Sequence, residues 1–422
     1  MADDMYIPRA VSAKLVAGLQ DSPVVLIHGP RQCGKSTLAR QFATPNKYAY
    51  YTFDDLVVLE AAESDPAGFV KGLPDRVVID EIQRVPKLLI AIKASVDRDR
   101  TPGRFLLTGS SNVLLHPGLS DSLAGRMSVV RLHPFSQSEL SGTGDRFLTE
   151  LLKGSSKTPA SSRGEDLELV ERMARGGYPA AIGRKGGARR SAWYRDYVDA
   201  IVARDVRSLT KIAGLDVLPK LLSAIAANTA SLLNVSELSG PFELSRPTLR
   251  GYLTVLRNVF LYDEVAAWND NRLSRLVKSP KIHIGDCGLG AAILGISGEE
   301  LTEDRKLFGR LVETFVFHEI QRQAGFSDDP IVLSHYRDKD GVEVDIVVEK
   351  GLRHVVGIEV KAGSTVPSSD FRGLRRLREV TGDRFRSGVV LYDGEQRVAF
   401  GEDLFAVPMS EMWRKPARNP RT

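Results

Sequence analysis

Residues 24–37, which read Val-Val-Leu-Ile-His-Gly-Pro-Arg-Gln-Cys-Gly-Lys-Ser-Thr, decide the fold of this chain. The stretch opens with a run of branched apolar residues, which is the composition of a buried parallel strand. Gly29 and Gly34 then bracket four residues, and Lys35 and Ser36 follow, so the pattern GxxxxGK[ST] is complete. With a strand before it and a helix after it, this pattern predicts a nucleotide site in an α/β fold.

Each part of this loop has its own task. The glycines let backbone N–H groups curl around the phosphates, while Lys35 neutralises the charge of the β- and γ-phosphates. The Ser36 hydroxyl binds Mg²⁺, and the helix N-terminus adds its partial positive charge. We therefore predict ATP and Mg²⁺ as cofactors. The predicted nucleotide-binding residues are Gly29, Pro30, Arg31, Gln32, Cys33, Gly34, Lys35, Ser36 and Thr37.

The composition is that of an ordinary globular protein, with 42% hydrophobic and 26% charged residues over 422 positions. This length predicts roughly two to four domains. The formal charge of +5 is small, so contact with nucleic acid through a local patch is permitted but not required. Two distant cysteines imply neither a disulfide framework nor a zinc site. Because we find no signal peptide and no long apolar run, we expect a cytoplasmic protein with no membrane partner.

A second apolar run, residues 76–81, ends in Asp80 and Glu81. The carboxyl ends of strands line the ligand crevice of an open α/β sheet. Asp80 can hold Mg²⁺ there, directly or through water, and Glu81 can polarise the attacking water. An acidic pair can also merely end a strand and cap the next helix. The phosphate loop upstream favours the catalytic interpretation, since the two motifs complete one another.

Residues 104–112 predict the next strand, which carries small polar side chains to the same end of the sheet. Thr108, Ser110 and Asn112 are candidates for sensing the γ-phosphate or orienting water, or they are simple turn residues. Arg126 precedes a further expected strand, residues 128–132. It is either an arginine finger, in cis or on a neighbouring subunit, or a surface ion-pair residue. The catalytic candidates are thus Lys35, Glu81 and Arg126.

Five motifs occur in order along the first third of the chain. They are Gly-Pro-Arg-Gln-Cys-Gly-Lys-Ser-Thr, Val-Ile-Asp-Glu-Ile-Gln, Leu-Leu-Thr-Gly-Ser-Ser, Leu-Ala-Gly-Arg and the Leu-His-Pro-Phe-Ser-Gln-Ser-Glu block at 132–139. Together they resemble the prokaryotic AAA-type ATPases that carry a C-terminal domain of unknown function. The resemblance implies Lys35, Ser36, Asp80 and Glu81 as the phosphate, Mg²⁺ and catalytic residues. It also favours a homo-oligomer, because arginine fingers in such ATPases often come from a neighbour.

After an ATPase domain at 1–150, residues 151–215 are predicted to form a linker and helical connector. The stretch 154–164 is rich in Ser and other small or polar residues, which is typical of a loop. Gly-Gly-Tyr-Pro at 176–179 then marks a tight turn, and residues 193–209 predict a helix. The resembling family has a similar turn and helix, for which we expect a packing role.

Residues 216–270 predict a winged helix, with helices at 218–228, from Val235 and from Ser245, and a strand-like segment at 261–268. Apolar residues at helical spacing would form the buried stripe of the third helix, namely Leu249, Leu253, Leu256 and Phe260. Along its flank lie the candidate DNA-binding residues Arg246, Arg250 and Arg257. Winged helices also serve as lids and protein-contact modules, so DNA and a protein partner are both candidates.

Residues 271–422 predict a final α/β domain with a helix at 308–321 and strands at 342–349 and 355–361. Strand alternation brings Glu359 and Lys361 to one face, with Asp345 on the adjacent strand. Two carboxylates can bind Mg²⁺ or Mn²⁺, and a nearby lysine can assist phosphodiester hydrolysis. Asp345 and Glu359-x-Lys361, preceded by helical Glu313, resemble the restriction-endonuclease-like PD-(D/E)xK superfamily. The resemblance implies a nuclease-like domain that is either active or kept as a DNA-binding or assembly module.

The sequence therefore predicts an α/β protein with a P-loop NTPase core of AAA type and a parallel sheet. A helical connector, a winged helix and a restriction-endonuclease-like α/β domain follow. Our main hypothesis is a Mg²⁺-dependent ATPase that couples its nucleotide cycle to a DNA-directed C-terminal module. One alternative is a slow ATP-dependent signalling switch whose nuclease-like domain only binds. The other is an ATP-regulated, metal-dependent DNA nuclease.

Overall fold

The structure, a computed structural model, describes residues 6–110, 123, 125–143, 146–154, 168–207, 216–271, 275, 278–298 and 300–414. The chain divides into two compact units. The first is Met1–Phe135 with Asn258–Phe260, and the second is Ser136–Arg257 with Leu261–Thr422. This division places its first boundary after Phe135, and the expected domain bounds at 150, 215 and 270 stay predictions.

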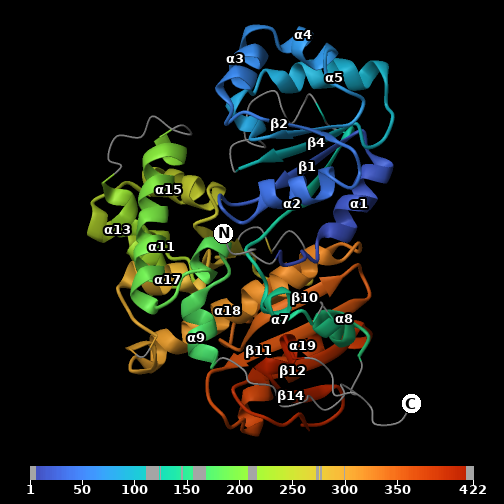
Figure 1. The fold of residues 1–422 in the computed structure, drawn as a ribbon. Helices are drawn as coiled ribbons and strands as arrows, with labels where there is room; N and C mark the ends of the chain where they lie inside the picture. Colours follow the sequence, from blue (N-terminus) through green and yellow to red (C-terminus); the bar gives the residue numbers. More distant parts are fainter. Residues whose placement is uncertain are drawn as a thin grey trace. The chain divides into compact units, whose positions relative to one another are not determined.

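The first unit is built on a parallel sheet with the strand order β2-β3-β4-β1-β5 (Figure 1). Its strands are β1 (Val24–His28), β2 (Ala49–Thr52), β3 (Val77–Asp80), β4 (Phe105–Gly109) and β5 (Met127–Arg131). The register pairs His28 with both Gly109 and Arg131, and Thr52 with Asp80. The residues that follow β1, β3 and β4 consequently meet at one edge of the sheet, as predicted for the phosphate loop and the acidic pair.

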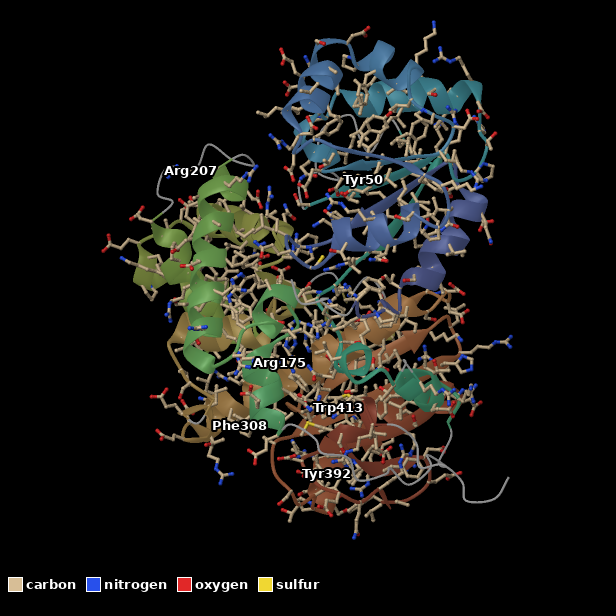
Figure 2. All side chains as sticks on the ribbon, viewed as in Figure 1. Tyr50, Arg175, Arg207, Phe308, Tyr392 and Trp413 are labelled. Carbon is tan, nitrogen blue, oxygen red and sulfur yellow. The ribbon has the colours of Figure 1, made fainter. Side chains whose placement is uncertain are left out.

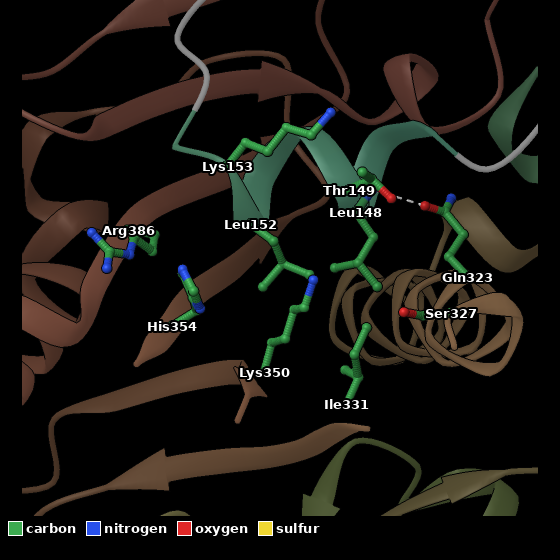
Figure 3. A pocket seen from close by; sticks show the side chains of 10 residues that line it. All are labelled: Leu148, Thr149, Leu152, Lys153, Gln323, Ser327, Ile331, Lys350, His354 and Arg386. Carbon is green, nitrogen blue, oxygen red and sulfur yellow. Dashed lines mark hydrogen bonds between the residues drawn. The ribbon is translucent and has the colours of Figure 1, made fainter. Parts of the chain in front are cut away.

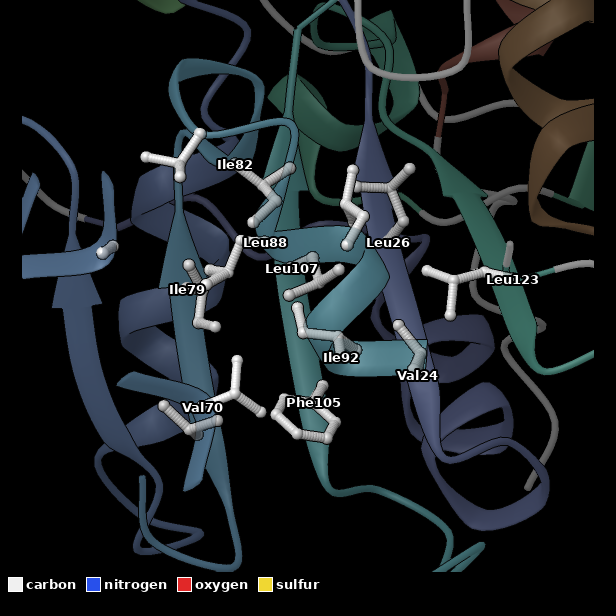
Figure 4. Close-up of a cluster of buried hydrophobic side chains, with 14 of the residues drawn as sticks. Val24, Leu26, Val70, Ile79, Ile82, Leu88, Ile92, Phe105, Leu107 and Leu123 are labelled. Atoms are coloured by element: carbon white, nitrogen blue, oxygen red, sulfur yellow. The ribbon is translucent and has the colours of Figure 1, made fainter. Parts of the chain in front are cut away.

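A hydrophobic core fills one side of this sheet, and Figure 4 shows its side chains. Leu26, Ile79 and Leu107 come from three neighbouring strands and are fully buried. They pack with Ile82 and with apolar residues of helix α5, including Ile92. The apolar runs of the sequence thus form a continuous core, which holds the strand ends that carry the functional residues in fixed positions.

Helices connect the strands of the first unit. They are α1 (Ser12–Asp21), α2 (Lys35–Ala43), α3 (Leu56–Ser64), α4 (Pro66–Lys71) and α5 (Leu88–Arg98), with a 3-10 turn at Ile82–Arg84. Asp55 caps α3 by accepting hydrogen bonds from Val57 N and Val58 N, and Asp65 caps α4 ahead of Pro66.

The second unit contains a set of mostly short helices. They are α7 (Gln137–Ser141), α8 (Arg146–Leu152), α9 (Leu169–Arg175), α10 (Pro179–Ile182), α11 (Gly187–Ile201) and α17 (Cys287–Leu294). Helix α11 starts six residues before the predicted 193 and continues as a π-helical turn, Val202–Val206. Leu209 and the linker residues 155–164 lie outside the described part of the chain.

The Gly-Gly-Tyr-Pro turn has a structural explanation in its contact with Asp286. Gly176 has a φ of 65°, and a Cβ there would lie 2.1 Å from both Asp286 Oδ1 and Tyr194 Oη. Gly177 N donates to Asp286 Oδ2 at 2.9 Å, and the Tyr194 hydroxyl donates to Asp286 Oδ1 at the same distance. Gly176 therefore lets the backbone approach a buried carboxylate, which supports the packing role expected for this motif.

Glu319 joins α18 (Arg305–Phe326) to the Ser-Gln-Ser-Glu segment of α7. This fully buried carboxylate accepts a hydrogen bond from Gln137 N at 2.8 Å and pairs with Arg322 at 2.9 Å. Nearby, Arg172 lies over the ring of Trp413, which is labelled in Figure 2. These charged groups are paired within the core, as buried charges must be.

A small antiparallel sheet of order β6-β8-β7 lies next in the chain, with strands β6 (Ser231–Leu232), β7 (Tyr262–Val265) and β8 (Lys281–Ile284). Helices α13 (Val217–Ala227), α14 (Val235–Ser239) and α15 (Arg246–Asn258) accompany it. Ser245 caps α15 by accepting from Thr248 N, and Leu249, Leu253 and Leu256 are buried. The expected stripe ends there, because Phe260 lies beyond the helix and is only partly buried.

The C-terminal part contains a separate mixed sheet of order β13-β14-β12-β11-β10-β9. Its strands are β9 (Ile331–Arg337), β10 (Glu343–Lys350), β11 (His354–Lys361), β12 (Phe385–Tyr392), β13 (Val398–Ala399) and β14 (Leu404–Pro408). Strands β9, β10 and β11 pair antiparallel, whereas β11, β12 and β14 run parallel. Helix α19 (Arg372–Thr381) packs on this sheet, and Leu374 and Leu377 are fully buried. The α/β character predicted for the whole chain is therefore confirmed in both units.

Among the residues that the structure describes, no helix is long and apolar enough to span a membrane.

Candidate nucleotide site

The phosphate loop runs from the end of β1 to the start of α2, and its glycines are required by close contacts and backbone angles. A Cβ on Gly29 would lie 2.0 Å from the carbonyl oxygen of Leu132, so no larger residue fits there. Gly34 has a φ of 101°, which other residues rarely adopt. The loop thus has the tightly curled backbone that a phosphate cradle needs.

Lys35 is buried and turned back onto its own loop. Its Nζ atom donates hydrogen bonds to the carbonyl oxygens of Gly29, at 3.1 Å, and Pro30, at 2.7 Å. The side chain is 5% exposed, so its positive charge is held at the mouth of the loop and not in bulk solvent. An ammonium in this place can exchange its carbonyl partners for phosphate oxygens.

Asp80 is the centre of a hydrogen-bonded cluster at the end of β3. Ser36 Oγ donates to Asp80 Oδ1 at 2.9 Å, and the Thr108 hydroxyl bonds to the same oxygen. The Tyr50 hydroxyl, from β2, donates to Asp80 Oδ2 at 2.7 Å. A hydroxyl and a carboxylate side by side are ligands that Mg²⁺ prefers, so Ser36 and Asp80 fit the predicted metal site.

Tyr50 is a residue of this cluster that the sequence motifs did not indicate. Figure 2 labels it on its strand. Burial and the hydrogen bond to Asp80 raise the pKa of its hydroxyl well above the ordinary value, so the group stays a proton donor. No local pattern in the sequence singles it out, because its contact with Asp80 depends on the pairing of β2 with β3.

Glu81 follows Asp80 and has left-handed backbone angles, with a φ of 60° and a ψ of 45°. A non-glycine residue in this region carries strain that often accompanies a functional role. Its backbone N–H donates to Thr108 Oγ1 at 3.0 Å, and its carboxylate accepts from the Gln83 side chain. Glu81 is thus held at the sheet edge beside Asp80, where a general base is expected to lie.

Two of the three candidate sensor residues are described. Thr108 is fully buried and bonds to both Asp80 and Glu81 N, so its hydroxyl connects the acidic pair to β4. Ser110 N donates to Gln83 Oε1 at 3.2 Å, and Gln83 in turn contacts Glu81. Asn112 lies outside the described residues.

Arg9 is a second residue that the sequence analysis missed. Its guanidinium donates to the carbonyl of Cys33 at 2.9 Å and to that of His133 at 2.6 Å, and it lies over the Phe135 ring. It therefore ties the phosphate loop to the segment that follows β5. Burial also raises the pKa of the Cys33 thiol, which keeps this loop residue neutral.

Arg126 lies at the opposite edge of the sheet from the phosphate loop. It immediately precedes Met127, which pairs with Val24 at the start of β1. The length of β1, on the order of 13 Å at about 3.3 Å per residue, separates that edge from the loop. Arg126 Nε also pairs with Asp97 at 2.6 Å. This position does not suit an arginine finger in cis and agrees with the alternative of an ion-pair residue.

The second unit brings the four nuclease-like candidates together. Lys361 Nζ lies 2.9 Å from Glu359 Oε1, and Val360 N donates to Asp345 Oδ2 at 3.0 Å. Glu313 reaches the same place from α18, because Lys281 Nζ lies 2.6 Å from Glu313 Oε1 and 3.1 Å from Asp345 Oδ1. Lys281, on β8, was not predicted, since it belongs to a different sheet.

Burial dominates the electrostatics of this carboxylate–lysine cluster. It raises the pKa of Glu313 to about 8, with a further contribution from the charge of Asp345. Burial likewise raises the pKa of Glu359 to about 8. Burial lowers the pKa of Lys281, but the charges of Asp345 and Glu313 outweigh it and leave the pKa raised. Lys281 is therefore a permanent cation of the cluster.

The three arginines of α15 differ in their surroundings. Arg246 and Arg250 are exposed, and among the described residues no carboxylate pairs with either of them. Arg257 instead pairs with Glu264 of β7 at 2.8 Å. Within the described part of the chain, two of the three candidates are therefore not paired with a carboxylate.

A pocket of about 440 Å³ in the second unit carries a different set of residues (Figure 3). Apolar side chains such as Leu148 and Ile331 line it together with Lys153, Lys350, His354 and Arg386. Lys350 pairs with Asp329 at 2.6 Å and Lys153 with Glu150 at 3.2 Å. Its positive charge is therefore partly balanced, and it includes none of the residues predicted from the sequence.

Comparison with known proteins gives three family matches along the chain. Residues 21–141 match an AAA domain, residues 166–300 a domain of unknown function (DUF8612) and residues 308–412 a domain of unknown function (DUF4143). A Walker-type ATPase of Pyrococcus abyssi covers 69% of this chain and 97% of its own, with 16% identity and a TM-score of 0.43. The RuvB Holliday junction branch migration motor of Thermotoga maritima covers 60% and 88%, with 18% identity and a TM-score of 0.29.

The parallel sheet, the phosphate loop and the match to the AAA domain define an AAA-type P-loop ATPase with a DUF4143 C-terminal region, which supports ATP binding and hydrolysis. An uncharacterized protein of Mycobacterium tuberculosis is 30% identical over 406 residues, which are 96% of this chain and 84% of that protein. The chain belongs to the same family as this mycobacterial protein. An uncharacterized protein of Haemophilus influenzae is 24% identical over 350 residues, with 78% and 80% covered.

Proposed function

We propose that the chain binds ATP with Mg²⁺ at the phosphate loop and hydrolyses it to ADP and phosphate. The observation that carries this proposal is the cluster at the end of β3, where Ser36 Oγ lies 2.9 Å from Asp80 Oδ1. Glu81 follows directly at the same sheet edge. A metal ligand pair and a general base, placed beside a phosphate cradle, are the groups that phosphoryl transfer to water requires.

Each residue then has one role. Lys35 turns from its carbonyl partners to the β- and γ-phosphates, and the loop backbone from Gly29 to Ser36 surrounds them. Ser36 and Asp80 hold Mg²⁺, which offsets the charge that develops on the phosphates. Glu81 accepts a proton from the attacking water. Thr108 holds Asp80 and Glu81 in position through its hydrogen bonds to both residues.

Nucleotide binding by the Lys35→Ala variant tests this assignment. We expect the variant to lose measurable binding of a fluorescent ATP analogue, because the loop no longer neutralises the phosphate charge. Lys14→Ala, on α1 and outside the phosphate loop, is the matched control and should bind as the unaltered protein does. Equal affinity of the Lys35→Ala variant and the control would contradict the proposal.

A second proposed function is that the nucleotide cycle is coupled to DNA through the winged-helix-like part of the second unit. The elements follow one another as α13, β6, α14, α15, β7 and β8, which is the order expected of a winged helix. The specific observation that favours DNA is the pair Arg246 and Arg250, both exposed at the start of α15. Arginines at the N-terminal part of a recognition helix meet phosphates or guanine edges.

ATP turnover with and without double-stranded DNA tests this coupling. We expect DNA to stimulate turnover, and Arg246→Ala with Arg250→Ala to remove the stimulation and leave basal turnover intact. Arg257→Ala should reduce the stimulation by DNA less than the double variant does, because Arg257 already pairs with Glu264. Turnover that is slow and indifferent to DNA would instead favour the signalling switch, with a protein as the partner of the second unit.

The proposed ATPase also allows a homo-oligomer. Because Arg126 lies at the sheet edge away from its own phosphate loop, any catalytic role for it requires a neighbouring subunit. Sedimentation with and without ATP measures whether subunits associate. Loss of turnover in Arg126→Ala without loss of ATP binding would place this arginine at a neighbour's site.

A further inference from the structure

Lys281 has its side chain almost completely buried within a group of carboxylates. It lies at the first residue of β8, in the three-stranded sheet, and its side chain is 5% exposed. Its Nζ atom lies 2.6 Å from Glu313 Oε1 on α18 and 3.1 Å from Asp345 Oδ1 on β10. One ammonium thus connects three elements, two of which bear the residues of the nuclease-like motif.

The remaining oxygens of the cluster are largely engaged as well. Asp345 Oδ2 accepts a hydrogen bond from Val360 N at 3.0 Å, so both oxygens of this carboxylate have partners. Glu359 Oε1 pairs with Lys361 at 2.9 Å. Glu359 Oε2 is buried and has no hydrogen-bond partner within the described part of the chain. Two lysines therefore pair with the side chains of all three acidic residues.

A divalent cation needs what this arrangement does not offer. Mg²⁺ and Mn²⁺ take about six oxygen ligands and use carboxylates whose oxygens are available. Here Glu313 and Asp345, which face each other across the cluster, share an ammonium between them. Among the residues described, no group of three or more His, Cys, Asp or Glu side chains is arranged to hold a metal ion.

We propose that Lys281 is the resident cation of this cluster and stands in the place that a divalent metal ion takes between paired carboxylates. The ammonium satisfies Glu313 and Asp345 and ties β8 to α18 and β10. The unaltered cluster consequently takes no divalent cation, and a neutral residue at position 281 opens it to one. This assignment concerns the second unit alone and does not depend on the proposed ATPase.

Binding of Mn²⁺ to the full, nucleotide-free chain tests the proposal, with free Mn²⁺ measured by electron paramagnetic resonance. The unaltered protein and its Asp345→Asn variant should bind Mn²⁺ equally, because the cluster of the unaltered protein is closed. The Lys281→Met variant should gain a Mn²⁺ site. The double variant that carries both Lys281→Met and Asp345→Asn should lack that site. Lys278→Met is the matched control, since Lys278 is exposed and donates to the carbonyl of Arg337, away from the carboxylate cluster.

Thermal unfolding supplies a readout that does not require a new metal site. Removing the ammonium leaves carboxylates buried without their cation, so Lys281→Met should lower the melting temperature. Adding Mn²⁺, or adding the Glu313→Gln change, should recover part of this loss. Mn²⁺ binding by the unaltered protein that Asp345→Asn abolishes would overturn the proposal. That comparison needs no change at position 281, so it decides the question even where Lys281→Met fails to fold.

Discussion

Ser36 Oγ and Asp80 Oδ1 lie 2.9 Å apart, although 44 residues separate them in the chain. The contact joins the first turn of α2 to the end of β3, because both follow strands that end at the same edge of the parallel sheet. Thr108 and Tyr50 hold Asp80 from the strands on either side. The metal ligands of the proposed ATPase are thus positioned by the sheet before any nucleotide arrives, which is the preorganisation that catalysis needs.

Replacing Tyr50 with Phe should weaken the dependence of turnover on Mg²⁺. The hydroxyl donates to Asp80 Oδ2 at 2.7 Å and so fixes the orientation of the carboxylate. Loss of such an outer partner typically lowers metal affinity by about 10–100-fold. We therefore expect the Mg²⁺ concentration for half-maximal turnover to rise by about tenfold or more. Tyr51→Phe, one residue along the same strand, is the control, and an equal shift there would contradict the assignment.

Replacing Arg9 with Lys should lower the affinity for ATP. The planar guanidinium reaches the carbonyls of Cys33 and His133 at once, at 2.9 and 2.6 Å, and a lysine ammonium does not reproduce this fork. The phosphate loop then loses its link to the segment after β5. Titration with a fluorescent ATP analogue measures the effect, and we expect the Kd to rise while the melting temperature changes little. An unchanged Kd would show that Arg9 has no part in holding the loop.

Glu319→Ala should strongly destabilise the second unit. The change leaves the Arg322 guanidinium without its 2.9 Å partner and Gln137 N without an acceptor, both inside the core. Breaking a buried pair in this way typically costs about 3–5 kcal/mol. Urea unfolding measures the loss. Glu150→Ala, which removes an exposed ion pair with Lys153, should cost less than about 1 kcal/mol.

Glu319 should also give stability a specific dependence on pH. Burial raises its pKa from the ordinary value of 4.5 to about 7. Because the folded state holds the proton more tightly, its contribution is fully present below about pH 4.5 and is lost as pH rises through about 7. Glu319→Gln does not titrate, so its unfolding free energy should fall less over this interval. Parallel pH profiles of the two proteins would contradict the raised pKa.

Local sequence patterns predicted the first unit better than the second. The phosphate loop and the acidic pair are contiguous motifs whose neighbouring strands are apolar runs, so their meeting at one sheet edge follows from parallel pairing alone. Arg9, Tyr50 and Lys281 have no such motif. Each reaches its site from a separate element through a register or packing contact that no local spacing encodes.

Arg126 does belong to a local motif, yet the motif did not show where this residue lies relative to the phosphate loop. Its Leu-Ala-Gly-Arg motif indicated a candidate catalytic arginine just before a strand, but the motif does not state whether that strand runs parallel to β1. The pairing of Met127 with Val24 places it at the edge away from the phosphate loop. Similarly, strand alternation correctly brought Glu359, Lys361 and Asp345 together, yet it carried no information about Lys281, which lies between Glu313 and Asp345.

The most direct test of the central claim is phosphate release by Glu81→Gln, with ATP binding measured in the same sample. We expect the variant to bind ATP with the affinity of the unaltered protein, because the phosphate loop, Ser36 and Asp80 are intact. Its rate of phosphate release should fall by about 10²-fold or more, since the general base is absent. Hydrolysis at the unaltered rate would contradict the account, because Glu81 would then not be the residue that activates water.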